Sequence, residues 1–146
     1  MKVLAINGSA RKDGNTAMLI NAVFEELNKA GIETEMVQLS GTIIEPCKAC
    51  WACGGRKNCV HKKDLFQYKV GAAVTAARRG GALTTLDAMN HFFMLQNMFV
   101  VGSSYWAMAY GQMQGDVHKD EEGLDTMRNL GQNMVYLLKS LNGKEG

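Results

Sequence analysis

The chain has 146 residues, of which 47% are hydrophobic and 21% are charged, and its formal net charge is +2. This composition is typical of one globular domain and argues against a disordered or membrane-spanning chain. The small net charge gives no case for nucleic acid, and no apolar run is long enough for a spanning helix or a secretory signal, so a cytoplasmic protein without membrane contact is expected.

The first elements expected along the chain form half of a βαβ unit. Lys2–Ile6 reads as a buried strand that ends at Asn7-Gly8, and a glycine-containing loop follows it. Apolar residues then recur at helical spacing from Ile20 to Ala30, where Gly31 ends the pattern. Ile32–Leu39 predicts a second strand.

The rest of the chain continues the alternation of strands and helices. A strand is predicted at Tyr68–Ala77, a helix at Leu83–Gln96, a strand at Met98–Ser104 and a helix at Gly123–Leu141. The pattern predicts a single α/β domain over residues 1–146, with a parallel sheet covered by helices on both faces.

The connection between Gln67 and Tyr68 is too short for this architecture. Residues 61–67, HKKDLFQ, read as the start of a helix, yet a strand is predicted directly after them. A helix of fewer than two turns cannot carry the crossover between two parallel strands. The sequence therefore predicts a missing helix–strand–helix segment of roughly 40–50 residues at this junction. The alternative is a naturally short four-stranded sheet.

The loop NGSARKDGNT, residues 7–16, lies between the first strand and the first helix. This junction belongs to the carboxyl edge of a parallel sheet, where such folds bind ligands. Its polar side chains and the free N–H groups of the helix N-terminus suit a phosphate monoester. Neither the Walker A pattern nor the dinucleotide-binding glycine pattern fits. An ordinary capped helix is the alternative.

All four cysteines lie in a loop at residues 45–61, EPCKACWACGGRKNCVH, which is inserted after the second strand. Their spacing, C-x2-C-x2-C-x5-C, is typical of a [4Fe–4S] site. Redox-active free thiols and a zinc site are the two alternatives, and zinc fits less well because structural zinc sites use two separated C-x2-C pairs.

A second glycine-rich turn, TAARRGGAL at residues 75–83, follows the predicted strand at Tyr68–Ala77. Gly80 and Gly81 allow a planar ligand to approach the backbone closely, and Arg78 and Arg79 can meet an anion. A glycine turn with two solvated arginines is the alternative.

Together these motifs resemble one protein family. GSARKDGNT resembles the phosphate loop of flavodoxin-like NADPH-dependent FMN reductases, and PCKACWACGGRKNCVHKKD resembles the cysteine motif of iron–sulfur flavoproteins in that superfamily. KVGAAVTAARRGG and FVVGSSYW resemble the family's fourth-strand loop and fifth strand. Two departures are Ala10 in place of a proline, and the absence of the family's third strand with its flavin loop.

The resemblance implies a flavodoxin-like doubly wound parallel sheet, and it implies roles for three groups of residues. It implies that the FMN phosphate is held by Ser9, Arg11, Asn15 and Thr16. It implies that the isoalloxazine ring lies along Ala77, Arg78, Gly80 and Gly81. It implies that the cluster is ligated by Cys47, Cys50, Cys53 and Cys59.

The leading hypothesis is an FMN-dependent oxidoreductase or electron-transfer flavoprotein that passes electrons between FMN and a [4Fe–4S] cluster. No catalytic side chain is predicted, because the electron step requires no acid or base and the flavin supplies the chemistry. The expected partners are an electron donor and an acceptor, such as ferredoxin, NAD(P)H or a quinone-like small molecule, and the resemblance implies a homodimer or homotetramer. The alternatives are a flavin- or thiol-based redox sensor without turnover and a structural zinc-loop protein.

Overall fold

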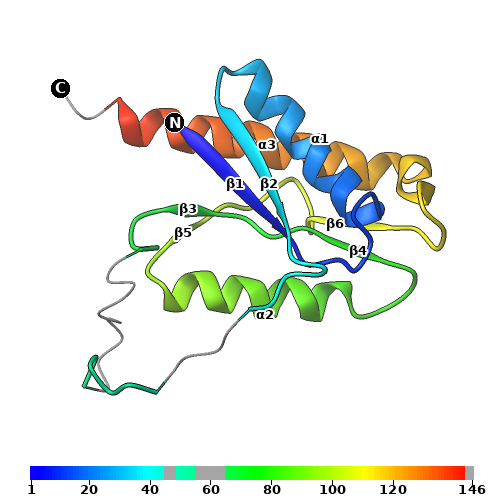
Figure 1. Ribbon diagram of the computed structural model, residues 1–146. Coiled ribbons are helices and arrows are strands. Elements are labelled where there is room, and N and C mark those ends of the chain that lie inside the picture. The colour runs from blue at the N-terminus through cyan, green and yellow to red at the C-terminus, as the bar shows by residue number, and fades with distance from the viewer. Residues whose placement is uncertain (45–48, 55–64, 144–146) are drawn as a thin grey trace.

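The computed structural model describes residues 1–44, 49–54 and 65–143 (Figure 1). Its strands are β1 (Lys2–Asn7), β2 (Glu33–Gln38), β3 (Val70–Gly71), β4 (Thr75–Ala77), β5 (Phe99–Val100) and β6 (Met108–Tyr110). Its helices are α1 (Asn15–Lys29), α2 (Ala82–Leu95), α3 (Glu121–Asn142) and the short 3-10 helix η1 (Asp116–Lys119). None of the helices in the described part of the chain has both the length and the apolar character needed to cross a membrane.

The strands form three parallel pairs. β1 pairs with β2 in a register that runs from Lys2 opposite Glu33 to Asn7 opposite Gln38. β3 pairs with β5, and β4 pairs with β6. The predicted mixed α/β architecture with parallel strands is therefore confirmed, whereas a single continuous sheet is not observed among the described strands.

Two predicted strands differ in detail from the observed ones. The strand expected at Tyr68–Ala77 is divided into β3 and β4, with Ala72–Val74 between them outside regular strand structure. The strand expected at Met98–Ser104 is reduced to β5, and the chain returns to strand structure at β6, which was not predicted. The glycine and alanine residues of GSSYWAMAYG weaken the strand pattern in the sequence, and β6 forms through its long-range pairing with β4.

One face of the strands is covered by α1 and α3, which pack against each other (Figure 1). The contact is close because Gly131 of α3 brings the backbones together: a Cβ built there would lie 2.9 Å from the Val23 carbonyl oxygen. The core lies mainly in this layer, and its fully buried members include Leu19, Leu27, Met127 and Leu130. Val3 and Ala5 of β1 pack against it from the sheet side.

The opposite face is covered only in part. Helix α2 contacts β4 and β5 and buries Ala82 and Leu86. On β1, the side chains of Leu4 and Ile6 point away from the α1–α3 layer and remain 54% and 60% exposed. The helical layer that was expected on both faces is therefore complete on one face only, as far as the described residues go.

The connection before β3 is a turn rather than a helix in its described part. Residues 61–64 of the predicted helix start lie outside the described residues, and Leu65–Gln67 form a bend and a turn. Tyr68 follows with a φ of +61°, in the left-handed region that a bulky residue rarely adopts. Its N–H donates to the Asn97 carbonyl oxygen (3.0 Å). The predicted helix start is thus not observed where it can be checked.

Candidate functional site

The loop after β1 is fixed to the sheet by two amide side chains. Asn7, fully buried at the end of β1, donates from Nδ2 to Gln38 Oε1 (2.8 Å) and to the Lys12 carbonyl oxygen (3.4 Å). Gln38, its partner in the β1–β2 register, donates from Nε2 to the Ser9 carbonyl oxygen (2.6 Å). These bonds hold the loop in one conformation before any ligand binds.

Within the loop, hydrogen bonds bend the chain back on itself. Ser9 N–H donates to Asn7 Oδ1 (3.1 Å), and Ser9 Oγ accepts from Arg11 N–H (3.2 Å). Gly14 N–H donates to the Arg11 carbonyl oxygen, and a Cβ on Gly14 would lie only 3.0 Å from Arg11 Cβ. Gly14 is therefore required by the tight turn, and the Arg11 side chain remains exposed at the surface of the loop.

The start of α1 is suited to an anion. The helix begins after Gly14 without a side-chain cap, and its first turn, which is fully described, contains no acidic residue. Backbone N–H groups in the first turn have no intrahelical acceptor, and the helix dipole places partial positive charge there. Thr16 lies in this first turn, half-buried. A phosphate group fits such an end with no further requirement.

Asn15 does not present its amide to the loop in this structure. Its Nδ2 donates to the Met113 carbonyl oxygen (3.0 Å), and its Oδ1 accepts from Gly115 N–H (2.8 Å). A Cβ on Gly111 would lie 2.7 Å from Asn15 Nδ2, so the segment after β6 packs directly against α1. Asn15 therefore joins the phosphate-loop segment to the segment after β6, and its contribution is to position these two loops.

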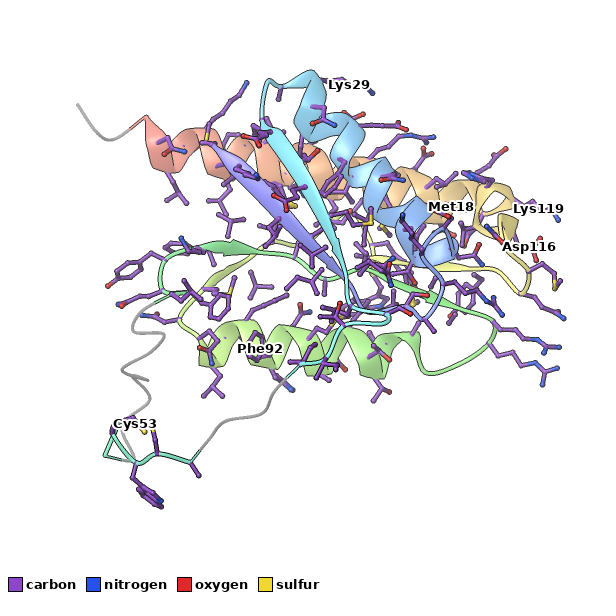
Figure 2. The ribbon with its side chains drawn as sticks, viewed as in Figure 1. Met18, Lys29, Cys53, Phe92, Asp116 and Lys119 are labelled. Carbon is purple, nitrogen blue, oxygen red and sulfur yellow. The ribbon has the colours of Figure 1, made fainter. Side chains whose placement is uncertain are left out.

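A shallow open pocket of about 340 Å³ adjoins this junction. It is lined by Arg78 from the second glycine-rich turn, by Tyr110 at the end of β6, and by residues of the segment that follows β6: Gly111, Gln112, Asp116, Lys119 and Asp120. Figure 2 shows Asp116 and Lys119 at the end of the molecule where α1 begins. The carboxyl ends of strands β1, β4 and β6 thus contribute to one region, as expected for a ligand site in a parallel sheet.

The acidic side chains in this pocket have protein partners. Asp116 accepts from Lys119 Nζ (2.8 Å) and from Met113 N–H (2.7 Å), and these two hydrogen bonds, the first more strongly, lower the pKa of Asp116. The same pair raises the pKa of Lys119. Asp120 accepts from Gly123 N–H and from Tyr110 N–H. Arg78 has no carboxylate within salt-bridge distance among the described residues, and it is the cation left to meet a ligand.

The other predicted flavin residues lie beside Arg78. Ala77 is the last residue of β4 and is half-buried, whereas Gly80 and Gly81 are exposed. Gly81 has a φ of +93° and precedes α2, so its backbone conformation favours glycine. A Cβ on Gly80 would meet nothing within 4 Å, and the protein itself gives no reason for glycine there.

Only part of the cysteine segment is described. Cys50 is exposed, Cys53 is half-buried, and both are free thiols; Figure 2 labels Cys53. Cys47 and Cys59 lie outside the described residues. Ala49 and Trp51, on either side of Cys50, have φ values of +47° and +54°. Backbone that alternates into the left-handed region is a conformation that cluster-binding and anion-binding loops use. The described residues contain no group of three or more potential metal ligands.

Several residues of the site were not predicted from the sequence. Asn7 and Gln38 hold the phosphate loop, and the pocket adds Gln112, Asp116 and Lys119. The register of the first two strands could have revealed the first pair, since the strand ends align Asn7 with Gln38. The pocket residues give no comparable sequence signal, because they meet Arg78 only through the pairing of β4 with β6.

Comparison with known proteins identifies the relatives of this chain. Residues 1–65 match the family model for NADPH-dependent FMN reductase. An iron–sulfur flavoprotein of Methanocaldococcus jannaschii is 29% identical over 189 aligned positions, which cover 95% of this chain and 98% of that protein. An iron–sulfur flavoprotein of Methanosarcina thermophila is 40% identical over 65 residues, 44% of this chain and 34% of its own length.

A further iron–sulfur flavoprotein, from Archaeoglobus fulgidus, is 36% identical over 69 residues, which are 47% of this chain and 31% of that protein. No solved structure matches the chain significantly. The region that matches the family model contains β1, the loop at residues 7–16, α1 and β2. Residues 1–65 are therefore similar to the NADPH-dependent FMN reductase family, and the chain as a whole is similar to iron–sulfur flavoproteins.

Proposed function

We propose that this protein is an FMN-dependent oxidoreductase or electron-transfer flavoprotein. The observation that supports the proposal is the start of α1, where free first-turn N–H groups, Arg11 and a fixed loop are suited to a phosphate monoester. The family match over the same residues supports FMN as the molecule that brings this phosphate. When bound, FMN supplies hydride or electron transfer, and the chain binds and orients it.

The residues proposed to hold the FMN phosphate are Ser9, Arg11 and Thr16, together with the first-turn backbone of α1. Asn15 is proposed to act by joining this loop to the segment after β6. The isoalloxazine ring is proposed to lie along Ala77, Arg78, Gly80 and Gly81, where the surface is open and Arg78 is available.

The phosphate assignment is tested by comparing FMN with riboflavin. Arg11→Ala is expected to weaken FMN binding roughly tenfold, as loss of one hydrogen bond to a charged group predicts, and to leave riboflavin binding unchanged. Lys12→Ala is the matched control, since Lys12 is an adjacent exposed cation with no proposed contact to the phosphate. Flavin fluorescence titration measures both affinities. Equal loss for FMN and riboflavin would contradict the phosphate assignment.

A [4Fe–4S] cluster is proposed to be ligated by Cys47, Cys50, Cys53 and Cys59. The supporting observations are the accessible thiol of Cys50, the left-handed backbone on either side of it, and the similarity to three iron–sulfur flavoproteins. Anaerobic purification is expected to give about four irons per chain, and Cys50→Ala is expected to lose them together with the broad absorbance near ~400 nm. One zinc per chain and no visible colour would contradict this assignment.

Turnover separates the reductase from a redox sensor. The purified flavoprotein is expected to reduce ferricyanide or a quinone repeatedly when NAD(P)H or reduced ferredoxin supplies electrons. A protein that is oxidised and reduced only once would favour the sensor.

A homodimer or homotetramer is also proposed, because the exposed side of α2 carries Phe92, Met94 and Leu95. Light scattering measures the oligomeric state.

We also infer that the connection between Gln67 and Tyr68 lacks a helix–strand–helix unit that the M. jannaschii iron–sulfur flavoprotein contains. The turn at Leu65–Gln67 and the left-handed Tyr68 support a strained short connection. The alignment with the M. jannaschii relative spans 189 positions, more than the 146 residues of this chain, so that relative has residues with no counterpart here. Sequencing of the native gene and mass spectrometry of the native protein test this inference.

A further inference from the structure

The chain between β6 and η1 contacts both of the loops that are proposed to hold FMN. We call residues 111–116 the connecting segment. At its start, Gly111 N–H donates to the Ala77 carbonyl oxygen (2.9 Å), which continues the pairing of β4 with β6. Ala77 is followed directly by Arg78 of the second glycine-rich turn. The connecting segment therefore begins beside the turn that is proposed to lie along the isoalloxazine ring.

Farther along, the connecting segment is bonded to the loop at residues 7–16. Two hydrogen bonds run between the segment and the Asn15 amide, as described above. In addition, Gln114 Nε2 donates to the Asp13 carbonyl oxygen (2.8 Å). These bonds join the segment to residues on either side of Gly14, directly before α1. One short stretch of chain thus contacts the proposed phosphate site at one point and the proposed ring site at another.

Asp116 shapes the connecting segment. Its Oδ2 accepts from Gln112 N–H (3.2 Å) and from Met113 N–H (2.7 Å). These two backbone donors lie outside helices and strands, and the carboxylate satisfies both of them. Asp116 N–H donates to the Met113 carbonyl oxygen (3.2 Å), the same oxygen that accepts from Asn15 Nδ2. The bend made by Asp116 therefore presents this carbonyl group to Asn15.

The backbone contacts of Asp116 matter more than its ion pair. Lys119 Nζ lies 2.8 Å from Asp116 Oδ1, but the Lys119 side chain is 82% exposed. Ion pairs at the surface contribute little to stability. Hydrogen bonds from N–H groups to a carboxylate are charge-assisted and are roughly twice as strong as neutral ones. Loss of the carboxylate would free the bend, with or without the lysine.

We propose that the connecting segment holds the loop at residues 7–16 and the turn at residues 75–83 at a fixed separation, and that Asp116 is the positioning residue that sets it. This inference rests on the proposed function and deepens it. FMN has its phosphate and its ring at opposite ends of a ribityl chain, so both loops must match the ligand at once. Loops held on a rigid frame bind such a ligand more tightly, because they lose less freedom on binding.

The experiment compares three ligands that use one or both loops. Asp116→Ala in the full chain is expected to weaken binding of FMN roughly tenfold, because FMN spans both loops. Riboflavin and inorganic phosphate each engage one loop only, so their affinities are expected to change less than about twofold. Flavin fluorescence measures the first two affinities, and competition with FMN measures the third. A general loss of structure would weaken all three.

Three further variants accompany Asp116→Ala. Asp116→Asn keeps a side-chain oxygen for the backbone donors and is expected to retain most of the FMN affinity. Gln114→Ala removes the bond to Asp13 without changing Asp116, and it is the second test if Asp116→Ala does not fold; a roughly threefold loss for FMN alone is expected. Asp125→Ala is the matched control. Asp125 forms the same kind of i,i+3 ion pair, with Arg128, but accepts from no backbone N–H in the described part of the chain.

A readout without flavin separates failure of this inference from failure of the proposed function. The amides of Ser9, Arg11 and Gly14 are hydrogen-bonded within the loop at residues 7–16. In the flavin-free protein, Asp116→Ala is expected to accelerate their hydrogen exchange roughly tenfold, and Asp125→Ala is expected to leave it unchanged. Unchanged exchange in Asp116→Ala would overturn the inference, as would equal weakening of all three ligands. A wild-type chain that binds no FMN would instead refute the proposed function.

Discussion

The two faces of the sheet differ sharply in how their apolar residues are covered. On the face of α1 and α3, Leu130 is 1% exposed, and Gly131 allows helix backbones to approach closely. On the other face α2 covers only β4 and β5, and Leu4 and Ile6 of β1 are exposed. Strand β1 therefore carries apolar side chains on both sides, and the described helices bury them on one side only.

The largest expected effect comes from a cavity-forming substitution in the packed layer of α1 and α3. Leu130→Ala is expected to lower the free energy of unfolding by about 2 to 5 kcal/mol, because it leaves a cavity in a close-packed layer. Leu4→Ala, the matched change on the open face, is expected to cost under about 1 kcal/mol. Urea unfolding measures both. Equal losses would mean that Leu4 is covered in solution, and the contrast between the faces would be wrong.

The next effect tests how tightly α1 and α3 pack. Gly131→Ala would gain roughly 1 kcal/mol of helix propensity, yet its Cβ would overlap with the Val23 carbonyl oxygen and with Glu26 Cβ. We expect a net loss of about 1 to 3 kcal/mol in the free energy of unfolding, because backbone atoms cannot move aside cheaply. Ser140→Ala, exposed on the same helix, is the control and is expected to be near neutral. A stabilised Gly131→Ala protein would refute the close contact.

A smaller effect is expected at the N-terminus of α3. Asp120 accepts from Gly123 N–H (2.9 Å) as the helix cap and from Tyr110 N–H (2.8 Å) at the end of β6. Asp120→Ala is expected to lower stability by about 0.5 to 2 kcal/mol, the range for loss of a capping side chain. Asp120→Asn is expected to restore most of it, since asparagine also caps helices. If both substitutions cost the same, the carboxylate charge matters more than the cap.

The smallest expected effect is a pH dependence of the α1–α3 contact. Hydrogen bonds from Lys29 and then Gln132 lower the pKa of Glu26, so this carboxylate stabilises the fold above its ordinary pKa. That contribution is lost as pH falls through the lowered folded-state pKa, because the unfolded chain binds the proton more readily. Glu26→Gln should flatten the acid limb of urea-unfolding midpoints measured against pH. An unchanged acid limb would show that the hydrogen bonds from Lys29 and Gln132 do not lower the pKa of Glu26 in solution.

The phosphate loop shows how far sequence reasoning reached into the site. GSARKDGNT predicted a turn and a helix start at the right residues, because strand, glycine turn and helix follow one another locally. The contacts of the Asn15 amide with Met113 and Gly115, about a hundred residues away in the chain, were not predicted, and its role toward the phosphate stays a prediction. Contacts of that separation leave no local pattern. The roles of the flavin-contacting residues and of the cysteines stay predictions.

Hydrophobic periodicity by itself determined β1, α1, β2 and α3, and it also located the short connection before Tyr68, since period and length are properties of consecutive residues. Tertiary structure alone decided that β6 is a strand, that Asn7 and Gln38 hold the loop at residues 7–16, and that one edge of β1 has no partner among the described strands. Each of these features depends on which segment from elsewhere in the chain lies beside the strand or loop. Pairing between segments far apart in the chain leaves no pattern in consecutive residues, so only the folded structure shows it.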